Sequence, residues 1–178
     1  MADRDVVGVL LVGGASTRFG SPKALVRFRG ETFAERAHRV LAEAFGQVIV
    51  VGKAADELPL PFQILDDGSE HRAAIVGVAA GLRLAGAELC VVVPTDMPFL
   101  TADFLEQLAE AAEGVDVAAA ETGPLPGAYR RSAMPVLERK IAAREFALHR
   151  AVEELDVQIV HGNLELLRNV NTLEDLPV

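Results

Sequence analysis

The sequence predicts an α/β fold, with a doubly wound, mostly parallel sheet and helices on both of its faces. Short runs rich in valine and isoleucine alternate along the chain with segments whose apolar residues recur at helical spacing. These runs are mostly apolar throughout, which is typical of strands that are covered on both faces. Because ligands of such folds bind at the carboxyl ends of the strands, we expect the functional residues in the loops that follow them.

Six segments have this strand pattern. They are residues 6–12, 47–51, 62–65, 89–93, 115–120 and 157–160. The loops expected at the binding edge of the sheet are residues 13–23, 52–53, 66–74, 94–98 and 121–128. No linker, repeat or low-complexity stretch divides the chain, so we expect one domain over residues 1–178. The proline-containing segments 59–61 and 124–127 are predicted to be loops within it.

Helices are predicted between the strands. A stripe of apolar side chains at helical spacing predicts a helix over residues 32–45, which Gly46 ends. A second helix is predicted over residues 102–112, with Thr101 as its N-cap and Asp103 in its first turn. The remaining predicted helices are residues 75–84, 132–143 and 146–155.

The composition excludes several classes of protein. The 178 residues carry a formal net charge of −9, and an acidic chain is not expected to bind nucleic acid. Uninterrupted apolar runs stay shorter than the roughly 18 residues of a membrane span, and the charged first five residues do not resemble a signal peptide. The single cysteine, Cys90, cannot form an internal disulfide, so the reducing cytoplasm is the expected compartment.

The loop over residues 13–23 is the most informative stretch of the chain. Gly13 and Gly14 allow a sharp turn whose N–H groups can hold an anion, and Arg18 and Lys23 add positive charge. The spacing fits neither a P-loop nor a dinucleotide fingerprint. The pattern therefore predicts a loop that binds the phosphates of a nucleoside triphosphate.

Positive charge gathers in the segment that contains this loop. Residues 18–39 carry six cations against two acids, which suits a small anionic substrate held at one place. Two of these cations, Arg36 and Arg39, stand on a predicted helix, and we interpret them as ordinary surface charges.

Asp96 follows another apolar strand, in the sequence Pro94-Thr95-Asp96-Met97-Pro98. A carboxylate at this position supplies the hard oxygen ligand that Mg²⁺ prefers, and the ion takes the rest of its shell from water and phosphates. The flanking prolines stiffen the loop. The alternative is that Asp96 caps the next helix, but Thr101 is the better-placed cap, so a metal-binding role is favoured.

Three other polar features each have two interpretations. Asp66 and Asp67 form either a solvated turn or a ligand contact after the third strand. Thr172 and Asp175 fit the cap of a short last helix, so Asn169 and Asn171 either belong to that cap or bind substrate. Arg130 either binds substrate oxygens or is a solvated charge at the end of a strand.

Several of these motifs resemble those of known nucleotidyltransferases. Leu11-Val12-Gly13-Gly14 with Arg18, Gly20 and Lys23 is similar to the signature L-x-G-G-x-x-x-R-M-G-x-x-K, with Phe19 in place of Met. The likeness to the molybdenum cofactor guanylyltransferases runs nearly the whole length. It includes their Pro-x-Asp-x-Pro at residues 94–98, their Gln-Pro-Leu…Tyr-Arg at residues 124–132 and their Asn-x-Asn-Thr at residues 169–172. Gly52 stands where the family often has a nucleotide-contacting Asn, so that contact is lost or moved to the backbone.

The resemblance implies a Rossmann-like fold of the nucleotide-diphospho-sugar transferase type and a set of site residues. The implied catalytic residues are Arg18, Lys23 and Asp96, and Asp96 is the implied ligand of Mg²⁺. The implied nucleotide-binding residues are Leu11, Val12, Gly13, Gly14, Lys23, Asp96 and either Asp66 or Asp67. Residue counts along the chain leave Asp66 and Asp67 equally placed.

The implied reaction transfers GMP from GTP to the terminal phosphate of molybdenum-molybdopterin, which forms molybdopterin guanine dinucleotide and releases pyrophosphate. Arg130, Asn169 and Asn171 are the candidate ligands of the pterin substrate. The alternatives are cytidylyl transfer to the same pterin, nucleotidyl transfer to a sugar or polyol phosphate, and a non-catalytic nucleotide-binding regulatory domain. Expected partners are GTP and molybdopterin, with transient contacts to proteins that deliver the pterin or to molybdoenzymes.

Overall fold

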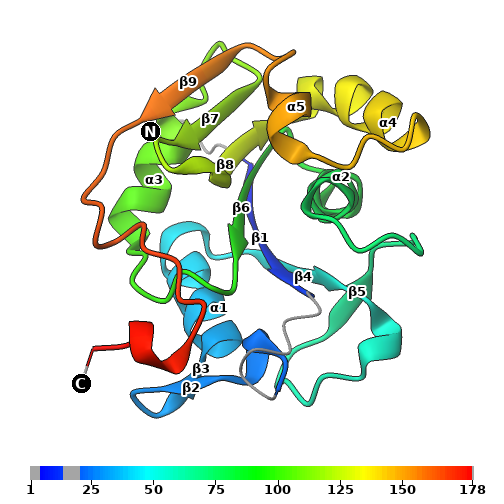
Figure 1. The fold of residues 1–178 in the computed structure, drawn as a ribbon. Helices are drawn as coiled ribbons and strands as arrows, with labels where there is room; N and C mark the ends of the chain where they lie inside the picture. The colour runs from blue at the N-terminus through cyan, green and yellow to red at the C-terminus, as the bar shows by residue number, and fades with distance from the viewer. Residues whose placement is uncertain (1–4, 14–20, 178) are drawn as a thin grey trace.

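The computed structural model describes residues 5–13 and 21–177. Within these residues the main sheet has seven strands in the order β5-β4-β1-β6-β8-β7-β9 (Figure 1). Their bounds are β1 Val6–Val12, β4 Val48–Gly52, β5 Ile64–Asp66, β6 Leu89–Pro94, β7 Val117–Ala120, β8 Gly123–Arg130 and β9 Val157–Val160. The pairings are parallel except those of β8 with β6 and β7. This mostly parallel sheet confirms the predicted fold class.

Helices cover both faces of the sheet. Their bounds are α1 Phe33–Phe45, α2 Ala74–Ala85, α3 Ala102–Ala111, α4 Met134–Ala142 and α5 Leu148–Val152. α1 and α3 pack on one face around Leu41, whereas α2, α4 and α5 pack on the other around Leu137 (Figure 1). In β1, Leu10 enters the first of these cores and Val9 the second, because successive side chains of a strand point to opposite faces. Both positions must therefore be apolar.

Two predicted end signals are confirmed, Gly46 at the end of α1 and Thr101 at the start of α3, and Thr32 is the N-cap of α1. The Thr32 hydroxyl accepts from the Glu35 N–H at 3.1 Å, and the Glu35 carboxylate accepts from the Thr32 N–H at 2.8 Å. This reciprocal capping box fixes the start of α1. Gly46 ends the helix with a φ of 73°, and Thr101 caps α3 through the Phe104 N–H.

A small hairpin, which was not predicted, connects the first loop to α1. It consists of β2 (Arg27–Phe28) and β3 (Glu31–Thr32), and it follows the 3₁₀ turn η1 (Lys23–Leu25). Phe28 and Phe33 form a third, minor core with Val170 from the C-terminal segment, and Phe99 packs against it. This core holds the C-terminal segment beside η1 and the loop after β6.

The predicted loops over residues 121–128 and 124–127 are wrong from residue 123 on. Residues 124–127 belong to strand β8, which pairs with both β6 and β7. Pro124 and Pro126 lack the N–H donor of a regular ladder, so the sequence favoured a loop. The structure accommodates them beside a register shift at Ala119/Ala120, and the Tyr129 hydroxyl donates to the Pro124 carbonyl at 2.6 Å. The strand is held by its neighbours rather than by its own propensity.

Two smaller findings complete the description of the fold. α5 is shorter than the predicted 146–155, since residues 153–155 form turns that bond to Ala151 and Val152. Among the helices that the structure describes, none combines the length and the apolar character needed to cross a bilayer.

Candidate active site

A cleft of about 1140 Å³ opens at the carboxyl ends of the parallel strands. Its lining comes from the ends of β1, β4 and β6, from η1, from the 3₁₀ turn η2 (Ala54–Asp56) and from the start of α2, together with Asp67 and Leu125. The parallel register aligns these strand ends, because Val12 pairs with Gly52 and Gly52 with Asp66. The cleft therefore lies where the sequence predicts ligand binding.

Lys23 and Asp96 face each other in this cleft. The Lys23 ammonium lies 3.3 Å from Oδ2 of Asp96 and donates to Oδ1 of Asn171 at 2.9 Å. Both charged side chains are partly buried. The backbone carbonyl of Asp96 accepts from the Val170 N–H at 2.7 Å. Asp96 lies 73 positions and Asn171 148 positions from Lys23 in the chain. The fold thus brings three distant residues into one hydrogen-bonded group.

The donor atoms around Asp96 fit a magnesium ion better than a tightly caged metal. In the described parts of the chain, residues 5–13 and 21–177, no group of three or more His, Cys, Asp or Glu side chains can hold a metal. A single carboxylate at an open cleft suits Mg²⁺, which keeps several waters and takes other ligands from substrate phosphates. The residues present therefore fit a metal that enters together with a phosphate ligand.

The C-terminal Asn-x-Asn-Thr segment forms the predicted cap, and one of its side chains also contacts a residue of the cleft. Thr172 and Asp175 form the capping box of the 3₁₀ turn η4 (Leu173–Asp175), and the amides of Asn171 and Thr172 hold the pKa of Asp175 below its usual value. The side chain of Asn171 meanwhile reaches Lys23. Asn169 is exposed and does not line the cleft.

The structure separates the two neighbouring acids after β5. Asp66 is exposed, and the N–H groups of Ala54 and Gly68 donate to it and lower its pKa. Asp67 is buried, lines the cleft and is paired with Lys53 at 2.7 Å. Asp66 therefore stabilises a turn, and Asp67 is the one of the two acids that lines the cleft.

Gly52 has no room for a side chain. A Cβ at this position would lie 2.1 Å from the backbone oxygen of Val12. Its carbonyl accepts from the Asp67 N–H at 2.9 Å. The side chain that this strand end sends into the cleft is that of Lys53, the next residue.

Replacing Gly52 with alanine is expected to lower the free energy of unfolding by about 1–3 kcal/mol, the usual cost of an extra carbon in a packed interior. The obstructing atom is backbone, so β1 and β4 have to move apart at the floor of the cleft. Urea unfolding followed by circular dichroism measures the change. An unchanged midpoint would contradict the close packing of these two strand ends.

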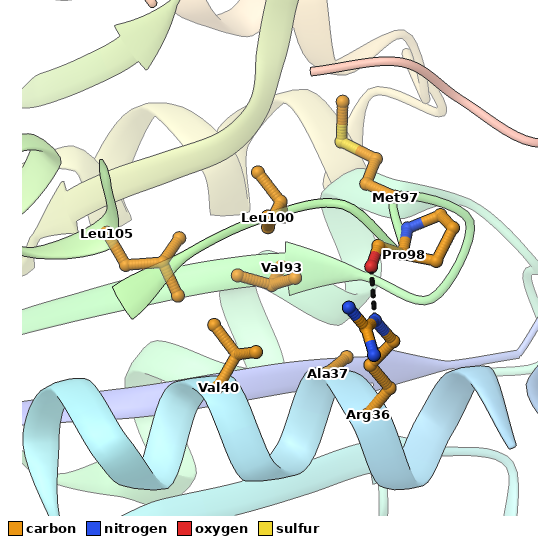
Figure 2. A pocket seen from close by; sticks show the side chains of 8 residues that line it. All are labelled: Arg36, Ala37, Val40, Val93, Met97, Pro98, Leu100 and Leu105. Carbon is orange, nitrogen blue, oxygen red and sulfur yellow. Dashed lines mark hydrogen bonds between the residues drawn. The ribbon is translucent and has the colours of Figure 1, made fainter. Parts of the chain in front are cut away.

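Arg36, interpreted from the sequence as a surface charge, instead supports the loop that carries Asp96. Its guanidinium donates to the backbone carbonyl of Pro98, two residues after Asp96, as Figure 2 shows. A second bond reaches Glu31 at 2.9 Å. Ala37, on the same helix, contributes to an apolar lining beneath this loop (Figure 2). α1 thus anchors the loop after β6 from below.

The other predicted site residues are Gly14, Arg18 and Arg130. Gly14 and Arg18 lie outside the described residues. Arg130 pairs with Leu89, the first residue of β6, whereas the cleft lies past the last residue of that strand, and its Nε donates to the Ala112 carbonyl at 2.7 Å. The structure does not bring Arg130 to the cleft.

Comparison with known proteins identifies the family. The family model described as the MobA-like NTP transferase domain matches residues 8–159, which include most of the first strand, Lys23 and Asp96. The chain belongs to the MobA-like NTP transferase family. It is accordingly a nucleotidyltransferase.

Individual members of the family are similar over nearly the whole chain. A probable molybdenum cofactor guanylyltransferase of Rhodopirellula baltica is 32% identical, covering 96% of this chain and 90% of that protein. The molybdenum cofactor guanylyltransferase of Desulfosudis oleivorans is 28% identical, covering 96% and 92%. The crystal structure of molybdopterin-guanine dinucleotide biosynthesis protein A from Archaeoglobus fulgidus aligns with a TM-score of 0.80 at 27% identity, covering 95% and 94%.

The charges of this MobA-like cleft are balanced within the described residues. Three cations line it, and each is paired with a lining acid: Lys23 with Asp96, Lys53 with Asp67, and Arg72 with Asp56. The last two pairs were not predicted, because each forms between loops that only the fold brings together. A triphosphate therefore needs positive charge beyond these three side chains.

Proposed function

We propose that this chain transfers GMP from GTP to the terminal phosphate of molybdenum-molybdopterin and releases pyrophosphate. The observation that carries the proposal is the pairing of Lys23 with Asp96 inside the cleft. The names of relatives that match over nearly the whole chain support the choice of substrates.

In the proposed reaction, an oxygen of the acceptor phosphate attacks the α-phosphorus of GTP. The bond between that phosphorus and the α,β-bridging oxygen breaks, and pyrophosphate leaves with the bonding electrons. No general base is needed, since a phosphate monoester is largely dianionic at pH 7. Catalysis then consists mainly of positioning and charge stabilisation.

Lys23 would stabilise the charge that develops on the α-phosphoryl oxygens. Leu11, Val12 and Gly13 line the floor beside it, and Gly13 has a φ of 155°, which favours glycine. From the sequence motif, we propose that Arg18 and the N–H groups of the glycine loop bind the phosphates that leave. Asp67 would meet the nucleotide farther along the cleft.

Asp96 would hold Mg²⁺. The ion, when bound, supplies charge neutralisation for the phosphates. Lys23 then exchanges its contact with Asp96 for the phosphate oxygens, while Asn171 keeps it oriented toward the cleft. The balanced charge of the described lining supports this proposal, because a triphosphate alone would add only negative charge.

The remaining proposals concern the domain, its cellular compartment, its partners and its pterin contacts. Residues 1–178 are proposed to act as one domain in the cytoplasm, where the buried thiol of Cys90, whose pKa burial raises to about 12, is unreactive. Molybdopterin-delivering proteins and molybdoenzymes are the proposed transient partners. Asn171 is retained as a candidate contact of the pterin, and Arg130 and Asn169 are not.

Thermal unfolding with GTP or CTP, each with Mg²⁺, tests the proposed nucleotide. GTP at a hundred times its Kd is expected to stabilise the fold by about 2.7 kcal/mol, and CTP at the same concentration by less. A larger shift with CTP would favour cytidylyl transfer. Pyrophosphate release with the pterin present distinguishes an enzyme from a regulatory domain that only binds nucleotide.

Replacing Arg36 with methionine is expected to raise the Mg²⁺ concentration for half-maximal activity about tenfold, because a residue that orients a metal ligand typically changes affinity by that order. The change removes the bond to Pro98 but keeps an apolar side chain in place. Arg39→Met is the matched control, since Arg39 also pairs with Glu31. An equal Mg²⁺ requirement in both variants would show that Arg36 does not position Asp96.

A further inference from the structure

Lys53 is almost fully enclosed at the edge of the cleft. It follows the last residue of β4, and 11% of its side chain is exposed. Its ammonium donates to Oδ1 of Asp67 at 2.7 Å, to the His71 carbonyl at 2.9 Å and to the Ser69 carbonyl. An ammonium has three N–H donors, so these three acceptors occupy all of them. Lys53 therefore acts on the loop over residues 67–71 rather than on a phosphate.

Asp67 is the group that these bonds fix. Its N–H donates to the Gly52 carbonyl at 2.9 Å, and its Oδ1 accepts from both Lys53 and the Ser69 N–H. Within the described residues, no donor is bonded to its other oxygen, Oδ2. A carboxylate with 8% exposure is costly without a paired charge. Lys53 thus keeps the carboxylate at the cleft wall with one oxygen available to a ligand.

The position of Asp67 indicates which part of a nucleotide it meets. Asp67 follows β5 and Asp96 follows β6, and these strands are separated by β4 and β1. Three strand spacings of about 4.8 Å place the two acids roughly 14 Å apart along the cleft. When the phosphates of a nucleotide bind near Lys23 and Asp96, its base and ribose extend along the cleft toward Asp67. A carboxylate repels phosphate but accepts from base N–H groups and ribose hydroxyls.

We propose that Lys53 is a positioning residue for nucleotide recognition, which acts by holding Asp67 toward the base and ribose. The inference rests on the proposed nucleotide site. Lys53 thus orients a nucleotide contact at the end of β4, where the preceding residue, Gly52, has no side chain. The Arg72–Asp56 pair, between the loop before α2 and η2, closes the same wall of the cleft.

A double-mutant cycle tests this role. Lys53→Met, Asp67→Asn and the double variant are titrated with GTP and Mg²⁺ by calorimetry, and KM and kcat are measured with the pterin. Lys53→Met is expected to raise Kd and KM for the nucleotide about tenfold and to change kcat less than about threefold, because misplacing a contact impairs binding geometry. The double variant is expected to bind no more weakly than the weaker single variant, since both act through one contact.

Lys140→Met is the matched control. Lys140 has 10% of its side chain exposed and pairs with Glu145 and Glu154 on the α4–α5 side, away from the cleft. It is expected to lower the unfolding temperature and to leave the nucleotide Kd unchanged. If Lys53→Met fails to fold, the double variant, which removes both members of the pair, is compared with Asp67→Asn alone, and equal Kd values are expected.

Several outcomes would overturn the inference. If the fold-increase in Kd of the double variant is the product of the two single increases, Lys53 contacts the nucleotide directly. If Lys53→Met leaves Kd unchanged, Lys53 has only a structural role. If the wild-type protein prefers CTP, the cycle is run with CTP. Binding without transfer would contradict the proposed reaction but not the role of Lys53, whereas absence of any nucleotide binding would contradict both.

Discussion

Replacing Asp96 with alanine is expected to lower kcat/KM for GTP about a thousandfold, which corresponds to ~4 kcal/mol of transition-state stabilisation. Asp96 is the one carboxylate beside Lys23 in the described cleft, and its loop is held by bonds from Arg36 and Val170. The other two acids that line the described cleft, Asp56 and Asp67, are paired with Arg72 and Lys53. Steady-state pyrophosphate release over a range of Mg²⁺ concentrations measures the loss.

Asp103→Ala is the matched control for this change. Asp103 is an exposed acid in the first turn of α3, seven residues further along the chain. It is expected to keep near-native activity. Circular dichroism and thermal unfolding establish that both variants fold. A folded Asp96→Ala protein with a near-native rate would contradict the phosphate site.

Replacing Lys23 with alanine is expected to lower kcat about a hundredfold or more, the usual cost of removing one group that stabilises developing transition-state charge. Lys23 lies at the start of η1, where Asp96 and Asn171 both contact its ammonium. The effect on kcat should exceed the effect on KM, because the proposed contact strengthens as the α-phosphoryl charge grows. Single-turnover measurements with GTP separate the two.

Lys23→Arg distinguishes charge from shape. A planar guanidinium carries the same charge but cannot place it at the position of a compact ammonium. We expect this variant to recover part of the lost rate. Equal rates for Lys23→Ala and the wild-type protein would remove Lys23 from the mechanism, and a purely KM effect would limit it to substrate binding.

The sequence predicted the strands of the sheet well, because their apolar runs report burial directly. Val6–Val12 and Val157–Val160 have the predicted bounds. The loops after parallel strands could also be placed, since strand direction determines which edge they occupy. Strand β8 shows the limit of this reasoning. Its prolines conceal the strand, and its antiparallel direction places Arg130 at the opposite edge from the cleft.

Side-chain pairs between distant loops could not be predicted. Counting residues left Asp66 and Asp67 equivalent, whereas the fold gives Asp66 the backbone amides of Ala54 and Gly68 and pairs the buried Asp67 with Lys53. Lys53 and its acceptors are 14 to 18 residues apart. Arg36 looked like any surface charge of an amphipathic helix, since its acceptor, 62 residues away, is a backbone carbonyl. Such contacts depend on loop conformation, which residue spacing alone does not specify.

Mass analysis of the product tests the central proposal most directly. The protein is incubated with Mg²⁺, molybdenum-molybdopterin and one nucleoside triphosphate at a time. We predict that GTP yields the guanine dinucleotide of the pterin together with one pyrophosphate per product. A cytosine dinucleotide formed in preference, or no pterin dinucleotide with any triphosphate, would contradict it.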